Sequence, residues 1–232
     1  MKRVCIHQPD FAPYLGFFDR LLDSDLFVIL DDAQFQKGGW NHRDQIKTPR
    51  GPAWLTLSVT KGPLHRPILD VELAANREVW VAKNLNQLRE NYEQAPFFER
   101  VFPEIAAIYQ QPWTYMVDIN MAFLRYLLDR LEIDVEIVHS STLGIPGASN
   151  QRLVDILRAV GGDHYISGTG ALAYLDHELF GSAGIVLEIQ QFHHPIYPQL
   201  FGDFIPFLST FDLLLNCGPN ARDIVRSCRA PK

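Results

Sequence analysis

The stretch that decides the fold is residues 3–32, RVCIHQPDFAPYLGFFDRLLDSDLFVILDD. It begins with an apolar run at 4–6 and ends with another at 26–30, and short continuous runs of this kind are typical of buried strands. Between them, apolar residues recur at 14, 15, 17, 18, 21 and 22, which is helical spacing. The stretch therefore predicts a strand, a helix and a second, parallel strand. Ligands gather at the carboxyl ends of such strands, so His7 and Asp31 are the first candidates for a site.

The remainder of the chain extends this pattern into an α/β fold. Residues 45–48 and 53–59 alternate around the turn 49–52 and predict a β-hairpin. The other elements expected are strands at 68–73, 135–138, 164–166 and 185–189, three helical segments between 76 and 130, a helix at 149–160, and mixed loop and helix over 202–230. We expect a Rossmann-like, mostly parallel sheet with a β-hairpin excursion and a helical insert. The sheet domain would comprise residues 1–75 and 132–232, and the insert residues 76–131.

Composition limits the function classes. The 232 residues, 47% of them hydrophobic, can bury a core without disulfides. The net charge of −6 disfavours a broad nucleic-acid or anionic-membrane surface. Cys5, Cys217 and Cys228 are scattered and have no metal-ligand spacing, which is typical of a reducing compartment. No signal peptide or long apolar run is present. We expect a cytoplasmic protein without membrane insertion or a metal site; composition leaves the oligomeric state open.

The polar residues after the second predicted strand form the densest candidate site. Lys37, Arg43 and Lys47 can neutralise a phosphate or carboxylate group. Trp40 offers a face on which a base or sugar can stack. A solvated loop is the alternative, but acids, amides, cations, an aromatic ring and glycines directly after a core strand favour a binding site. The expected ligand is a small anionic or activated molecule.

Two segments of the C-terminal half are weaker candidates. Ser167 and Thr169 follow a short strand in a Ser-Gly-Thr-Gly sequence, whose backbone N–H groups can bind an anion, although a plain tight turn is the alternative. His194 precedes Pro195, which forces an extended backbone, and Tyr197 follows. A buried aromatic wrap is the alternative for this second segment.

These clusters together resemble the WbqC-like family of bacteria over essentially the whole chain. The matching residues begin with His7-Gln8-Pro9, Pro13-Tyr14-Leu15-Gly16-Phe17-Phe18, Asp31, Gln34-Phe35, Trp40 and Asn41-His42-Arg43, and continue with Tyr165 to Ala171, His194-Pro195, Tyr197, Gln199 and Asp212. The resemblance implies a link to O-antigen and other surface-polysaccharide biosynthesis, and a glycine (aminoacyl) transferase role. His42 departs from the family pattern, in which Arg or Ser is expected.

A fainter likeness is to nucleotidylyltransferases of the HxGH superfamily. Tyr14-Leu15-Gly16-Phe17 stands where the HxGH sequence would follow the first strand, and Tyr14 and Phe17 replace its two histidines. Those histidines stabilise phosphate charge in the transition state, so their loss argues against ordinary nucleotidyl transfer. A retained fold with other chemistry is compatible with the replacement.

Three functions remain as hypotheses. The first is an aminoacyl or acyl transferase, in which His7 is the general base and Asp31 orients either His7 or the acceptor. An anionic donor would be held by Lys37, Arg43 and Lys47. The second is a nucleotide-dependent ligase or nucleotidyltransferase-like enzyme with Mg²⁺ on Asp31 or Asp32. The third is a ligand-binding protein without turnover. The candidate substrate-binding residues are Gln8, Tyr14, Gln34, Lys37, Trp40, Asn41, Arg43, Ser167, Thr169, His194 and Tyr197.

Overall fold

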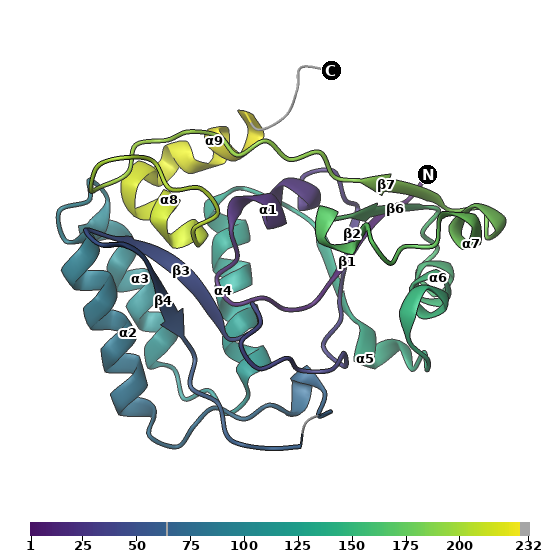
Figure 1. Cartoon of the computed structure of the whole chain (residues 1–232), viewed down its shortest axis with the longest axis horizontal. Helices are drawn as coiled ribbons and strands as arrows, with labels where there is room; N and C mark the ends of the chain where they lie inside the picture. The colour runs from purple at the N-terminus through teal and green to yellow at the C-terminus, as the bar shows by residue number, and fades with distance from the viewer. Residues whose placement is uncertain (64, 228–232) are drawn as a thin grey trace.

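The computed structural model describes residues 1–63 and 65–227, and its centre is a parallel sheet of five strands. The strands are β1 (Arg3–His7), β2 (Leu26–Ile29), β5 (Glu136–His139), β6 (His164–Ser167) and β7 (Val186–Ile189). They are ordered β5-β2-β1-β6-β7, and each neighbouring pair is parallel. The expected Rossmann-like α/β fold is confirmed (Figure 1).

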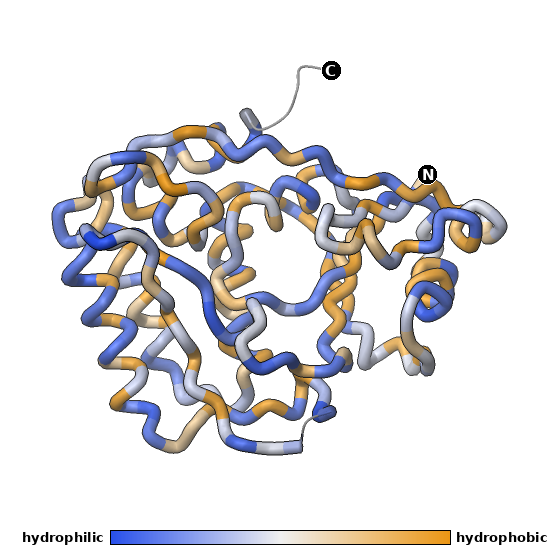
Figure 2. The backbone as a smooth tube through the Cα atoms, viewed as in Figure 1, coloured by the Kyte–Doolittle hydropathy of each residue, from blue (hydrophilic) through white to orange (hydrophobic). Residues whose placement is uncertain are grey.

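The two faces of the sheet are covered by separate apolar clusters, as the alternation of side chains along a strand requires. Cys5 and Phe27 belong to one cluster, with α1 (Leu15–Leu21), whereas Val4 and Val28 belong to the other, with α6 (Ser149–Ala159). Burial on both faces explains why these strands read as continuous apolar runs. Figure 2 shows the same pattern as hydrophobic colour concentrated in β1 and β2.

The hairpin and the helical segment lie beside the sheet. Strands β3 (Arg43–Thr48) and β4 (Gly51–Thr56) pair with each other in a separate two-stranded sheet. Helices α2 (Arg77–Tyr92), α3 (Phe98–Gln110) and α4 (Met116–Arg130) follow. They share one apolar cluster with the hairpin, with α1 and with α8 (Thr210–Cys217). Residues 76–131 therefore share their apolar core with the rest of the protein. The division of the chain at residues 76 and 131 stays a proposal.

The strand predicted at 68–73 is wrong. Residues Ile68–Asp70 form the 3₁₀ helix η1, in which the N–H of Val71 donates to the carbonyl of Ile68 at 3.1 Å. Ile68 and Val71 are both buried, because three-residue spacing puts them on one side of the turn. Among the described residues, only isolated bridges flank this turn, at Pro67, Glu72 and Leu73.

Short elements complete the described chain. They are α5 (Ser140–Leu143), η2 (Thr169–Ala171), α7 (His177–Ser182), η3 (Gly218–Asn220) and α9 (Ala221–Ser227). Cys228 and the end of the segment predicted at 202–230 lie outside the described residues. None of the helices found within residues 1–63 and 65–227 has the length and apolar character needed to cross a membrane.

Candidate functional site

A cleft of about 950 Å³ opens at the carboxyl ends of the central strands. His7 ends β1, Ser167 ends β6, and both line it. After β1 the chain builds the sheet outward through β2 and β5, and then returns to place β6 on the other side of β1. The gap between β1 and β6 is therefore the topological switch point, where open α/β sheets bind their ligands. The cleft is large enough for a nucleotide-sized molecule.

Eight of the residues predicted from the sequence meet in this cleft. They come from four separate segments, which only the fold brings together. They are His7, Gln8, Tyr14, Gln34, Trp40, Asn41, Ser167 and Thr169. The six other predicted residues, which are not part of the lining, are Asp31, Lys37, Arg43, Lys47, His194 and Tyr197.

Asp31 fastens β2 to β5. Its carboxylate accepts hydrogen bonds from His139 Nδ1 at 2.9 Å, from the Ser141 hydroxyl at 2.7 Å and from the Ser141 N–H at 3.0 Å. These hydrogen bonds lower the pKa of Asp31 against the opposing effect of its burial. Asp31 is therefore ionised and occupied by partners on β5 and α5, rather than turned toward His7.

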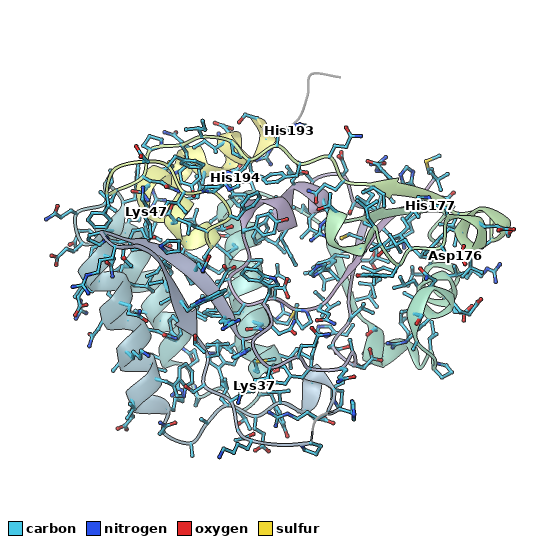
Figure 3. All side chains as sticks on the ribbon, viewed as in Figure 1. Lys37, Lys47, Asp176, His177, His193 and His194 are labelled. Carbon is cyan, nitrogen blue, oxygen red and sulfur yellow. The ribbon has the colours of Figure 1, made fainter. Side chains whose placement is uncertain are left out.

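Lys47 lies in a buried network away from the cleft. Its side chain is 1% exposed, and Nζ donates to the carbonyl oxygen of Asp203 at 2.6 Å. Beside it, Asp212 accepts hydrogen bonds from the hydroxyls of Tyr92 at 2.7 Å and Tyr197 at 2.8 Å. The network ties the hairpin to α2, α8 and the segment before α8. Figure 3 shows Lys47 and Lys37 at well-separated positions, so these cations do not form one site.

Arg43 and His194 pack against aromatic rings. The guanidinium of Arg43 lies 4.2 Å from the ring of Trp54, which in turn lies 5.6 Å from Trp40. His194 lies between Tyr197, at 6.2 Å, and Phe207, at 5.3 Å. Arg43 thus supports the Trp40 face of the cleft from behind, and His194 belongs to the aromatic wrap that was the alternative interpretation.

His42, which departs from the family pattern, is a structural residue of the loop before β3. It is buried, and Nε2 accepts from the Gly38 N–H at 2.8 Å while Nδ1 donates to the Leu57 carbonyl at 3.3 Å. Burial lowers the pKa of His42, so the ring is neutral and can accept at one nitrogen. Through Gly38 it fixes the loop that carries Trp40.

His7 and Asp10 lie side by side in the cleft. Nδ1 of His7 lies 3.0 Å from the carbonyl oxygen of Gln8 and 3.6 Å from Oδ2 of Asp10. Asn41 Nδ2 donates to the other carboxyl oxygen of Asp10 at 3.1 Å. The Asn120 side chain donates to the backbone carbonyls of Pro9 and Asn41, which holds the two loops against each other. Nδ1 of His7 is thereby the donor, and Nε2 keeps its lone pair.

Burial shifts the titration of this pair in opposite directions. Desolvation, with the charge of Arg20 adding to it, lowers the pKa of His7 to about 3. Desolvation raises the pKa of Asp10 to about 7, although Arg20 opposes it. Near neutral pH the histidine is therefore uncharged, and the carboxyl group is the one that exchanges a proton. A pKa near the working pH is what general acid–base catalysis requires.

Asp10 and Arg20 are site residues that sequence reasoning missed. Arg20 sits on the buried side of α1, is 6% exposed, and lines the cleft. Its Cζ lies 5.5 Å from the ring of Phe17. The sequence feature that could have indicated Arg20 was its position three residues after Phe17, where a cation stands next to the apolar stripe of the predicted helix. Asp10 stood in the polar cluster after the first strand, but the adjacent histidine attracted the assignment.

The third side of the cleft is built by α6. Gly147, Ala148 and Ser149 line it. The N-cap residue is Ala148, and it forms no side-chain hydrogen bond to the start of the helix. Arg152 also lines the cleft, but its guanidinium is paired with Asp32 and donates to the Ile145 carbonyl. In the part of the chain that the structure describes, no three His, Cys, Asp or Glu side chains are grouped as metal ligands.

Comparison with known proteins identifies the family. The model of the WbqC-like protein family matches residues 8–224, nearly the whole chain. The chain belongs to the WbqC-like protein family. A relative from Mycobacterium tuberculosis, described as "Uncharacterized protein Rv1507c", is 31% identical over 232 residues, which is 99% of this chain and 100% of the relative. No solved structure matches this WbqC-like chain.

Proposed function

We propose that this WbqC-like protein is a transferase that moves an aminoacyl (glycyl) or acyl group from an activated donor to a sugar or a small amine. Surface-polysaccharide or small-molecule biosynthesis is the setting that fits the family. The observation that supports catalysis is the His7–Asp10 pair, which faces a nucleotide-sized cleft at the switch point of the sheet. An inert binding site has no need for a carboxyl group that titrates near neutrality.

In this proposal Asp10 is the general base. It takes the proton from the acceptor O–H or N–H, and the acceptor lone pair attacks the carbonyl carbon of the donor. The bond to the leaving group then breaks, and that group departs with the electron pair. The hydroxyls of Ser167 and Thr169, on the opposite strand end, can donate to the developing oxyanion. His7 lies beside Asp10 and offers Nε2 as an acceptor, instead of serving as the base expected from the sequence.

A transfer assay tests the proposal directly. The protein is incubated with acetyl-CoA, or with glycine and ATP–Mg²⁺, together with a panel of amino sugars, nucleotide sugars and small amines, and products are detected by mass spectrometry. We expect one acceptor to gain a glycyl or acetyl group, and Asp10→Asn to lower the rate by about 10²-fold or more. Asp134→Asn, at an exposed position outside the cleft, is the matched control. Product formation at the same rate by Asp10→Asn removes Asp10 from the mechanism.

A nucleotide-dependent ligase or nucleotidyltransferase-like enzyme is the second candidate, favoured by the position of the cleft at the switch point. It requires a Mg²⁺-dependent rise in melting temperature with ATP or CTP. Its proposed metal ligands are engaged elsewhere: Asp31 with His139 and Ser141, and Asp32 with Arg152. Retention of a ligand without any product would instead favour the third hypothesis, a non-catalytic binding protein.

A further inference from the structure

Within residues 1–63 and 65–227, the buried guanidinium of Arg20 contacts the ring of Phe17 but forms no ion pair. Among the described residues, no hydrogen bond satisfies its Nε, and no ion pair includes it. Removing a charge from water costs several kcal/mol unless a counter-charge or hydrogen bonds compensate for it. A buried, unpaired donor of this kind in a cleft calls for a ligand that supplies the missing anion.

The surroundings of Arg20 are adapted to its position. Gly168 packs on the guanidinium so closely that a Cβ there would overlap Nη1 of Arg20. Glycine at this position therefore lets the loop after β6 approach the cation. The following residues Thr169 and Gly170 open the 3₁₀ helix η2 and line the same cleft.

The charge balance of the cleft also favours an anion at Arg20. Three aspartates line the cleft: Asp10, Asp32 and Asp44. Asp32 is neutralised by Arg152. Burial raises the pKa of Asp10 to about 7, so its carboxyl group is partly protonated near neutral pH, and burial also raises the pKa of Asp44. The negative charge that faces Arg20 in the cleft is therefore reduced.

We propose that Arg20 and the loop after β6, which packs on it at Gly168, form a subsite for a phosphate or diphosphate group. The N-terminus of α6, which lines the same cleft, adds a favourable dipole. The subsite rests on the proposed function for its role, which is to hold the phosphorylated part of the donor. Arg20 is close enough to His7 and Asp10 to shift the pKa of both, so the bound phosphate lies next to the reacting pair. Trp40, half exposed at the mouth of the cleft, is placed to stack on a base or sugar.

Isothermal titration calorimetry with pyrophosphate tests the subsite without any turnover. ADP and glucose 1-phosphate are the second and third probes, and they distinguish a nucleotide source of the phosphate from a sugar-phosphate source. Wild-type protein is expected to bind pyrophosphate, and Arg20→Met to bind it roughly tenfold or more weakly. Arg158→Met, at an exposed position on α6, is the control for loss of one cation and is expected to bind within about twofold of wild type.

Two further variants protect the test against misfolding. Gly168→Ala keeps the charge but displaces the guanidinium, and Arg20→Lys keeps the charge but loses the planar fork; both are expected to weaken binding. Equal affinity of wild type and the Arg20 variants, or failure of the folded wild-type protein to bind any of the three probes, overturns the subsite. Arg20-dependent binding without product in the transfer assay would leave the subsite standing and reject the transferase.

Discussion

Asp10→Asn is expected to stabilise the protein at high pH while it removes the proposed base. The side chain of Asp10 is 13% exposed, and its pKa rises from 3.8 to about 7 on folding. Between these two values the unfolded chain has lost its proton and the folded chain has kept it. The folded state therefore binds more protons, and stability falls as pH rises through this window, by up to about 1.4 kcal/mol for each pH unit. Above about pH 7 the loss is complete.

The magnitude follows from the same two values. The difference of about three pH units corresponds to up to about 4 kcal/mol, of which about 2–3 kcal/mol is lost between pH 5 and pH 8. Asn at position 10 is uncharged throughout and escapes this loss. The assay is urea unfolding of wild type, Asp10→Asn and the exposed control Asp134→Asn at pH 5, 6, 7 and 8.

We expect the stability of Asp10→Asn relative to wild type to rise steadily from pH 5 to pH 7 and then to level off. The Asp134→Asn control is expected to stay nearly constant relative to wild type. A stability difference for Asp10→Asn that does not change with pH would refute the raised pKa, and with it the choice of Asp10 as base. A difference that changes in the opposite direction would mean that the folded state stabilises the carboxylate.

Three other predictions concern two structural residues outside the cleft and one residue that lines it. Asp212→Ala removes the acceptor of two buried tyrosine hydroxyls, and we expect it to cost about 2–4 kcal/mol in urea unfolding without changing pyrophosphate affinity. A change in affinity with intact stability would contradict the structural role of Asp212. Because the pKa of His42 is lowered in the folded state, the imidazole of the unfolded chain takes up its proton at a higher pH, and stability is lost as pH falls through 6.5. Thermal melts from pH 7.5 to pH 5 should show a smaller fall in melting temperature for His42→Asn than for wild type. An equal fall would contradict the lowered pKa of His42. Trp40 is 53% exposed, so we expect Trp40→Ala to change the unfolding free energy by no more than about 0.5 kcal/mol. The same variant is expected to weaken ADP binding but not pyrophosphate binding. Equal weakening of both would exclude a stacking role for Trp40.

The strands that build the site were predictable because they are buried on both faces. The runs at 4–6 and 26–30 contain hardly any polar residue, and a parallel sheet demands this pattern. The rule that ligands bind at strand carboxyl ends then placed His7 and Ser167 in one site, 160 positions apart along the chain. The hairpin alternation was equally clear, since one of its faces packs on the core.

The distribution of cations around the cleft was not predictable from their sequence density. Arg43 and Lys47 are four residues apart, but on an extended strand this is about 13 Å, and one lies on Trp54 while the other is buried beside Asp212. Arg20 became a site residue only because α1 packs against the sheet with this side chain inward. Packing between segments far apart in the sequence set the positions of both the hairpin cations and Arg20. The same packing buries Asp10 and thereby raises its pKa.

The most direct test of the whole account is a crystal structure of the protein soaked with pyrophosphate. We predict pyrophosphate oxygens within hydrogen-bond distance of the Arg20 guanidinium, beside the loop at Gly168, with open space beside Asp10 for an acceptor. Pyrophosphate bound at another face of the protein, or inside the cleft without contact to Arg20, would contradict the account.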